Sequence, residues 1–189
     1  MKVVGQELPR VGILEKVTGQ SVFGADVRLP SPFLFGKVLR SPHAHARIKK
    51  IDAKRAERLK GVKAVVTAQD LPKVRYGWFV KDEDYLASTK VRAVGDKIAA
   101  VAAVDEETAE EALSLIKVDY EVLPLLTDPS EAVREDAPLI HEDYDKYMAV
   151  PMIQGRKGNI CFNRQIVVGD LERGFQEADR IFEHRFYAP

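Results

Sequence analysis

KIAAVAAVDEETAEEALSLIKVDYEV, residues 97–122, is the part of the sequence that most clearly predicts an α/β fold. Its first eight residues are apolar on both faces, as is typical of a central strand. Asp105 then caps a helix whose apolar positions repeat at helical spacing, namely Ala109, Ala112, Leu113 and Ile116. Residues 117–122 return as a strand, so this stretch predicts one complete strand-helix-strand unit.

A second strand-helix-strand unit is predicted earlier in the chain. Residues 44–51 alternate between apolar and polar side chains, which favours a strand. Asp52 is then expected to cap a short helix that ends at Gly61, and residues 62–67 follow as a strand. The two units together predict a mixed α/β fold.

Two further strands are expected beside these units. Residues 36–40 alternate weakly, and residues 91–94 lead into the apolar run 97–104 across a Gly95–Asp96 turn, as a hairpin would. Residues 124–164 are rich in proline, glycine and charge and are predicted to be mostly linker, with a short helical stretch at 129–135.

The last 25 residues predict a third strand-helix-strand element. Residues 165–168 form its first strand, Asp170 caps its helix, and residues 181–187 form its last strand. That final strand ends at Pro189 with nothing to cover its edge. We therefore expect a continuation of the chain or a partner chain to pair with it.

Composition excludes several classes of protein. Lys plus Arg and Asp plus Glu both number 29, so no global field favours nucleic acid or an anionic membrane. The single cysteine, Cys161, excludes an internal disulfide and a four-cysteine cluster supplied by this chain alone. The longest apolar run is far shorter than a membrane helix needs. These features predict a cytoplasmic protein that neither spans a membrane nor binds nucleic acid.

Several groups of residues could carry chemistry, and each has a plainer explanation. His43 and His45 could bind a metal if a third ligand arrived, or could be hydrogen-bonded structural histidines. The acidic run 82–84 could supply a carboxylate pair, or form a solvated turn. Cys161 could be a nucleophile, or an incidental thiol. The basic stretch 47–63 could bind an anion or RNA, or be a solvated face.

The aromatic loop, residues 76–80, is the most suggestive feature of the sequence. It carries Tyr76, Trp78 and Phe79 around Gly77. Loops of this composition line cavities or fill interfaces, although they also pack back onto their own core. No G-x-x-x-x-G-K-[ST] or G-x-G-x-x-G motif is present, so neither common nucleotide-binding motif supports a site in this chain.

The segments together resemble the N-terminal part of the molybdenum-cofactor-binding large subunit of the xanthine dehydrogenase and aldehyde oxidase family. The most specific match is Ser41-Pro-His-Ala-His-Ala-Arg-Ile48. The other matching segments follow in order along nearly the whole chain: Lys16–Gly19, Phe23–Asp26, Leu39–Arg40, Ile51–Asp52, Gly61–Val62, Val66–Pro72, Val91–Gly95, Ala99–Ala103, Val118–Pro124, Gly158–Asn159, Val168–Asp170 and Ala178–Asp179.

This resemblance implies an organisation for the chain. It implies an extended N-terminal arm at residues 1–17, an a/b hammerhead domain at 18–124, a linker at 125–164, and the truncated start of the molybdopterin-binding domain at 165–189. In such enzymes a hammerhead loop reaches toward the substrate channel, which makes Trp78 and Phe79 the candidate channel-lining residues. The histidine pair becomes part of a structural signature.

The resemblance also implies which groups and partners belong to the whole enzyme. No catalytic, cofactor-binding or metal-binding residue is assigned here, because the family's molybdopterin motifs and general base lie beyond this segment. Molybdopterin with its molybdenum, the [2Fe-2S] clusters and, in some members, FAD are expected on the remaining domains or subunits, which would be the partners of this chain. The chain would shape the channel and be inactive alone. The alternative is a cofactor-free scaffold or binding module that reuses the hammerhead fold.

Overall fold

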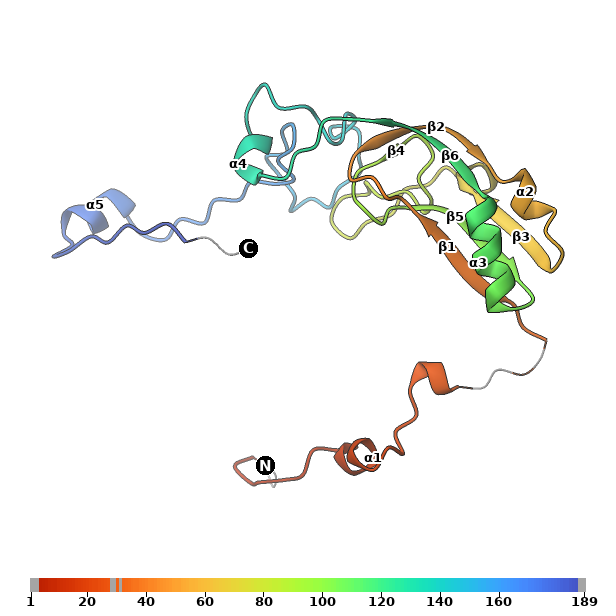
Figure 1. Ribbon diagram of the computed structural model, residues 1–189. Coiled ribbons are helices and arrows are strands. Elements are labelled where there is room, and N and C mark those ends of the chain that lie inside the picture. Colours follow the sequence, from red (N-terminus) through yellow and green to blue (C-terminus); the bar gives the residue numbers. More distant parts are fainter. Residues whose placement is uncertain (1–3, 28–29, 31, 187–189) are drawn as a thin grey trace.

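The structure is a computed structural model that describes residues 4–27, 30 and 32–186. The remaining positions, which include the predicted arm's first residues and the predicted final residues Tyr187 and Pro189, lie outside the described part. Figure 1 shows a folded core of strands and helices, with one arm leading to it from the N-terminus and another leaving it toward the C-terminus.

The first sheet has three antiparallel strands in the order β1-β5-β3. Strand β5 (Lys97–Ala103) lies between β1 (Phe35–Arg40) and β3 (Val62–Thr67). Four of its side chains, Ile98, Ala99, Val101 and Ala103, are buried, so the predicted central strand is confirmed.

The second sheet is also antiparallel, with strand order β4-β2-β6. Its strands are β4 (Lys90–Val91), β2 (Ala46–Asp52) and β6 (Lys117–Val122). The predicted hairpin between residues 91–94 and 97–104 is wrong, because β4 pairs with β2 rather than with β5. The bend at Gly95, which has a φ of 91°, instead passes the chain from one sheet to the other.

Two helices pack on each other and against the first sheet. Helix α2 (Lys54–Glu57) is shorter than predicted, and the Asp52 carboxylate accepts a hydrogen bond from the Lys54 amide at 3.2 Å. Helix α3 (Glu106–Leu115) is confirmed, and Asp105 accepts from the Thr108 amide at 2.7 Å.

One core lies between the helices and the first sheet, and a second joins the other sheet to Ile98 of β5. The first contains Ala53, Ala56, Ala99, Val101, Ala112 and Ile116, and the second contains Ala46, Ile48, Ala87, Val91 and Ile98. Alanines dominate the helical side of the first core, which lets helices and sheet approach closely. Both predicted strand-helix-strand units are present, and in each the helix connects a strand of one sheet to a strand of the other.

The arms carry only short elements. The predicted extended arm, residues 1–17, is not wholly extended, because α1 (Ile13–Val17) forms its end; a 3-10 turn (Gly24–Asp26) follows it. Another 3-10 turn (Ala68–Asp70) follows β3, α4 (Pro129–Ala132) lies in the predicted linker, and α5 (Leu171–Gln176) lies in the C-terminal arm. Within the described residues, none of the helices has the length and hydropathy needed to span a membrane.

The predicted strands at 165–168 and 181–187 are wrong for the described residues, since 165–168 and 181–186 form no ladder. A strand exists only beside a hydrogen-bonded partner, and these segments lie on an arm away from the core (Figure 1). Their apolar side chains are exposed, including Val168, Phe182 and Phe186.

Candidate functional site

The aromatic loop is held in a tight turn at its base. The Tyr76 amide donates to the Glu83 carbonyl at 2.9 Å and the Glu83 amide donates back at 3.0 Å. The Lys81 ammonium donates to the Gly77 carbonyl at 2.7 Å. Gly77 has a φ of 148°, and a Cβ there would lie 1.8 Å from the Val80 carbonyl oxygen. Only glycine fits this turn.

A second segment fixes the outer part of the loop. The Lys81 amide donates to the Met148 carbonyl at 2.8 Å, and the Val150 amide donates to the Phe79 carbonyl at 2.9 Å. This pairing places Val80 opposite Ala149. Because neighbouring side chains alternate across paired strands, Val80 faces inward while Phe79 and Val150 share the outer face.

The two predicted channel residues lie on the surface of the described structure. Trp78 is 91% exposed and Phe79 is 53% exposed. Met148, on the paired segment, is also exposed. The sequence analysis missed Met148 and Val150 as neighbours of the loop, and the only local signal for them is the short apolar run before Pro151. Two segments far apart in the sequence, residues 78–79 and 148–150, thus present one apolar surface, which we call the apolar rim.

Aromatic and cationic side chains brace the base of the loop. Tyr76 and Tyr85 stack with ring centroids 4.8 Å apart, and the Lys97 ammonium donates to the Tyr76 hydroxyl at 2.7 Å. Arg75 pairs with Asp84 at 3.2 Å and its guanidinium lies 4.6 Å from the centroid of the Tyr147 ring. These contacts join the loop both to β5 and to residues 139–147.

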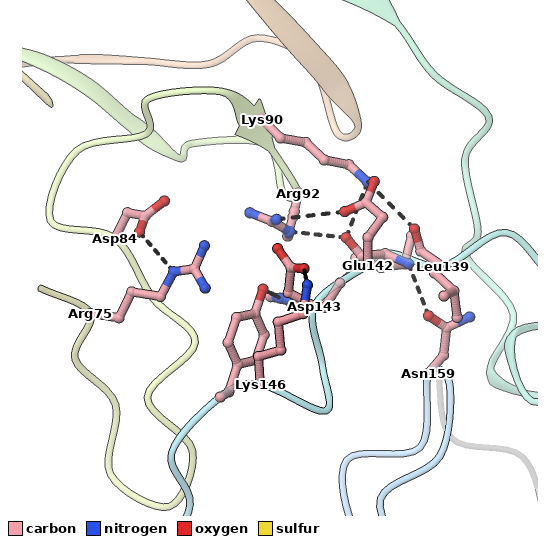
Figure 2. Close-up of polar contacts among 12 residues, drawn as sticks. Arg75, Asp84, Lys90, Arg92, Leu139, Glu142, Asp143, Lys146 and Asn159 are labelled. Atoms are coloured by element: carbon pink, nitrogen blue, oxygen red, sulfur yellow. Dashed lines mark hydrogen bonds and ion pairs between the residues drawn. The ribbon is translucent and has the colours of Figure 1, made fainter. Parts of the chain in front are cut away.

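A polar clasp, formed by Lys90, Arg92 and Glu142, attaches residues 139–147 to the two-sheet core. Lys90 is 7% exposed, and its ammonium donates to Glu142 at 2.6 Å and to the Leu139 and Ile140 carbonyls at 3.4 and 3.1 Å. Arg92 Nε donates to the same Ile140 carbonyl at 2.9 Å. Figure 2 shows Lys90 and Arg92 converging on Glu142.

Asn159 fixes the same segment from the other side. Its side-chain oxygen accepts from the Ile140 amide at 2.9 Å, and its amide nitrogen donates to the carbonyls of Ala132 and Pro138 at 3.0 and 3.1 Å. Figure 2 shows the Asn159 side chain pointing toward the segment that carries Leu139 and Glu142. The 139–142 part of the predicted linker is therefore held to the two-sheet core by Lys90 and Arg92 and to the rest of the linker by Asn159.

Glu142, His141 and Tyr147 are among the titratable groups of this region with shifted pKa values. Partial burial alone would raise the pKa of Glu142, but the hydrogen bond from Lys90 and the charges of Lys90 and Arg92 outweigh it and lower that pKa. Burial lowers the pKa of His141, and Arg92 lowers it further. Burial raises the pKa of the Tyr147 hydroxyl. At neutral pH Glu142 is therefore charged, and His141 and Tyr147 are neutral.

The two signature histidines have separate structural roles. The His45 ring is buried, and its Nδ1 hydrogen-bonds to the Pro124 carbonyl. The His43 ring packs edge-on against Tyr120 with centroids 4.8 Å apart. Among the described residues, no three His, Cys, Asp or Glu side chains come together in a way that could hold a metal. The structure thus offers the histidine pair no third ligand within that part of the chain.

The other candidates from the sequence are dispersed. Cys161 is exposed, and of the acidic run Asp84 is paired with Arg75. The basic stretch is partly neutralised, because Arg47 and Lys49 pair with Glu121 at 3.2 and 3.6 Å. What the structure does bring together is the aromatic loop, its apolar rim and the polar clasp.

Comparison with known protein families gives a match to one family model. The model, described as "Aldehyde oxidase and xanthine dehydrogenase, a/b hammerhead domain", matches residues 18–124. This range contains both sheets, the two packed helices and the aromatic loop.

Curated relatives match over nearly the whole chain. A probable xanthine dehydrogenase subunit of Bacillus subtilis is 41% identical over 175 residues, which cover 92% of this chain and 22% of the relative. A "Nicotinate dehydrogenase large molybdopterin subunit" of Eubacterium barkeri is 35% identical over 98% of this chain and 40% of the relative. The chain therefore spans well under half the length of these relatives.

Solved structures match as well. The CO dehydrogenase of Oligotropha carboxidovorans superposes with a TM-score of 0.70 at 40% identity, over 82% of this chain and 20% of that one. A Cu,Mo-CO dehydrogenase superposes with a TM-score of 0.71 at 36% identity, over 93% of this chain and 23% of that one. The match to the second structure extends well beyond residues 18–124.

Proposed function

Because this chain belongs to the aldehyde oxidase and xanthine dehydrogenase family through its a/b hammerhead domain, we propose that it is the N-terminal part of a molybdenum hydroxylase large subunit. The assembled enzyme would hydroxylate, or in one branch reduce, an activated carbon atom. Its partners would be the remaining molybdopterin-binding domains and the iron-sulfur and FAD domains or subunits. Residues 165–189 would begin the molybdopterin-binding domain.

This chain's own residues do not fit a redox centre. The described part brings no three metal-ligating side chains together, and its one cysteine is exposed. Molybdopterin would supply the redox chemistry from elsewhere in the assembly, and no chemical step is assigned to side chains of this chain. Its contribution is to position surfaces: the polar clasp and Asn159 fix residues 139–147, and those residues brace the aromatic loop.

The observation that carries a channel-shaping role is the exposure of Trp78 and Phe79 on a loop whose backbone is fixed. An exposed tryptophan and phenylalanine are costly in water, and the turn at Gly77 together with the pairing to residues 148–150 keeps both from folding inward. We assign Phe79 and Trp78 to the wall of the substrate channel in the assembled enzyme. The apolar rim with Val150 and Met148 would extend that wall.

The alternative, a free-standing scaffold, fits the arms less well. A self-contained module would cover its apolar side chains within its own fold. Here both arms expose large apolar residues, among them Val11, Val17, Val168 and Phe182. Such arms favour a chain whose surface is completed by the rest of an assembly.

Steady-state kinetics of the assembled enzyme test this proposal. Phe79→Ala and Trp78→Ala should change the ratio of kcat/KM values for benzaldehyde and acetaldehyde, or for the enzyme's own large and small substrates, by about tenfold, which corresponds to about 1.4 kcal/mol. Molybdenum content should stay unchanged. Val94→Ala, at an exposed apolar position outside the loop, is the matched control. A ratio that neither loop variant alters would contradict the channel role.

A further inference from the structure

A cavity of about 320 Å³ lies behind the aromatic loop, between its inward face and the residues that the clasp holds in place. Val80, which faces away from Phe79, contributes to its wall together with Leu126 and Ile160. The rings of His141, Tyr144 and Tyr147 also line the space. Its volume is at the lower end of the range for small-molecule sites, and mixed apolar and aromatic walls are typical of such sites.

Polar side chains line this cavity as well, and some of their hydrogen-bonding capacity is unused. His141 Nδ1 lies 3.2 Å from the Tyr147 hydroxyl, while its Nε2 makes no hydrogen bond within the described part of the chain. The Asp82 carboxylate, also in the wall, makes no ion pair or hydrogen bond there either. Arg156 donates from Nη2 to the Tyr147 carbonyl at 3.1 Å. One carboxylate and one guanidinium leave the cavity without net charge.

The hydrogen-bonding roles follow from the protonation states. Burial keeps the Tyr147 hydroxyl protonated by raising its pKa, and keeps the His141 imidazole neutral by lowering its pKa. If the Tyr147 hydroxyl donates to Nδ1, the imidazole proton resides on Nε2, which becomes a donor to a ligand. Asp82 remains an acceptor. A ligand with one acceptor and one donor on a flat ring would complement both.

We propose that this cavity binds a neutral, planar aromatic molecule carrying a carboxamide-like group, whose oxygen accepts from His141 Nε2 and whose N–H donates to Asp82. The ring packs among Tyr144, Tyr147 and the apolar wall. A charged ligand is disfavoured because the cavity carries no net charge to offset its desolvation. The proposal is independent of the channel role of Trp78 and Phe79, which lie on the outer side of the loop.

Isothermal titration of the 189-residue chain with benzamide tests the proposal, once circular dichroism and a cooperative urea transition have shown that the isolated chain is folded. Saturable binding should be seen for benzamide and be weaker by about tenfold or more for cyclohexanecarboxamide, which is not planar, and for benzoate, which is charged. Absence of saturable benzamide binding, or equal binding of all three molecules, would overturn it.

Two variants place the binding in this cavity. Ala132→Phe fills a wall position and should weaken benzamide binding by about tenfold or more, and His141→Phe should weaken it through loss of the donor. Ala137→Phe is the matched control, because it makes the same substitution in the same segment at a residue outside the cavity wall; binding should stay within about twofold. Wild-type affinity in both Ala132→Phe and His141→Phe would contradict the assignment.

Discussion

Replacing members of the polar clasp should lower the free energy of unfolding by amounts that differ in a defined order. Glu142→Gln keeps the size of the side chain but removes the negative charge. Lys90 then holds a buried ammonium, 7% exposed, whose acceptors are all uncharged: the Leu139 and Ile140 carbonyls at 3.4 and 3.1 Å and the new side-chain amide oxygen. Lys90→Met removes the positive charge instead. It leaves Glu142 in contact with water and Ile140 still bonded to Arg92.

The magnitudes follow from burial. Removing one partner of a fully buried ion pair costs about 3–5 kcal/mol. The Glu142 side chain is 54% exposed, so water screens part of its interaction with Lys90. We therefore expect Glu142→Gln to lower the free energy of unfolding by about 1–3 kcal/mol. Lys90→Met should cost about 1 kcal/mol, because Glu142 remains hydrated. The double variant should cost little more than Lys90→Met alone, so the second substitution partly rescues Glu142→Gln.

Urea unfolding followed by circular dichroism measures these free energies. Amide hydrogen exchange at Ile140, whose N–H donates to Asn159, reports on the order of the segment that the clasp holds in place. Exchange at Ile140 should accelerate in Glu142→Gln and slow again in the double variant. The control is Lys146→Met, because Lys146 makes an exposed ion pair with Asp143 and should change stability by less than about 1 kcal/mol. Strict additivity of the two single-variant costs would refute the coupled clasp.

Three further outcomes are expected. Gly77→Ala should destabilise the aromatic loop by about 1–3 kcal/mol and speed chymotryptic cleavage there, because its Cβ would lie 1.8 Å from the Val80 carbonyl oxygen; an unchanged cleavage rate would contradict this. Asn159→Ala removes three hydrogen bonds and should lower the free energy of unfolding in urea by about 2–3 kcal/mol. Asn159→Asp should restore part of this stability, because its carboxylate can still accept from the Ile140 amide. Equal stability of the two variants would count against the role of Asn159 in fixing residues 132–140. Burial lowers the folded-state pKa of His141 below its ordinary value of 6.5, so the unfolded state takes up the proton first. The free energy of unfolding should therefore fall as the pH drops from about 6.5 through the lowered value. His141→Phe should flatten this fall, and an identical pH profile would exclude His141 as its source.

Local patterns in the sequence were sufficient to predict the elements of the core. The alternating and helical periods of residues 97–122 predicted β5, α3 and β6 because each pattern depends only on neighbouring residues. Strand pairing depends on distant residues instead. The short β4 next to Gly95 looked like a hairpin arm, and only the folded chain shows that it pairs with β2. Residues 165–168 have strand propensity but no partner among the described residues, so they form no ladder.

The candidate site was predictable only in part. The aromatic loop was recognisable from its composition, and Gly77 from its place between aromatic residues. The clasp was not, because Lys90 in a strand-like segment is usually an exposed residue. Its partner Glu142 lies 52 residues further along the chain. A contact of that separation leaves no local pattern in the sequence.

Molybdenum content and turnover most directly test the central claim that this chain is a positioning part of a molybdenum hydroxylase. The purified 189-residue chain and the assembled enzyme containing it would be compared by metal analysis and by oxidation of hypoxanthine and benzaldehyde. The account predicts that molybdenum and turnover occur only in the assembled enzyme. Stoichiometric molybdenum and robust turnover in the isolated chain would contradict it.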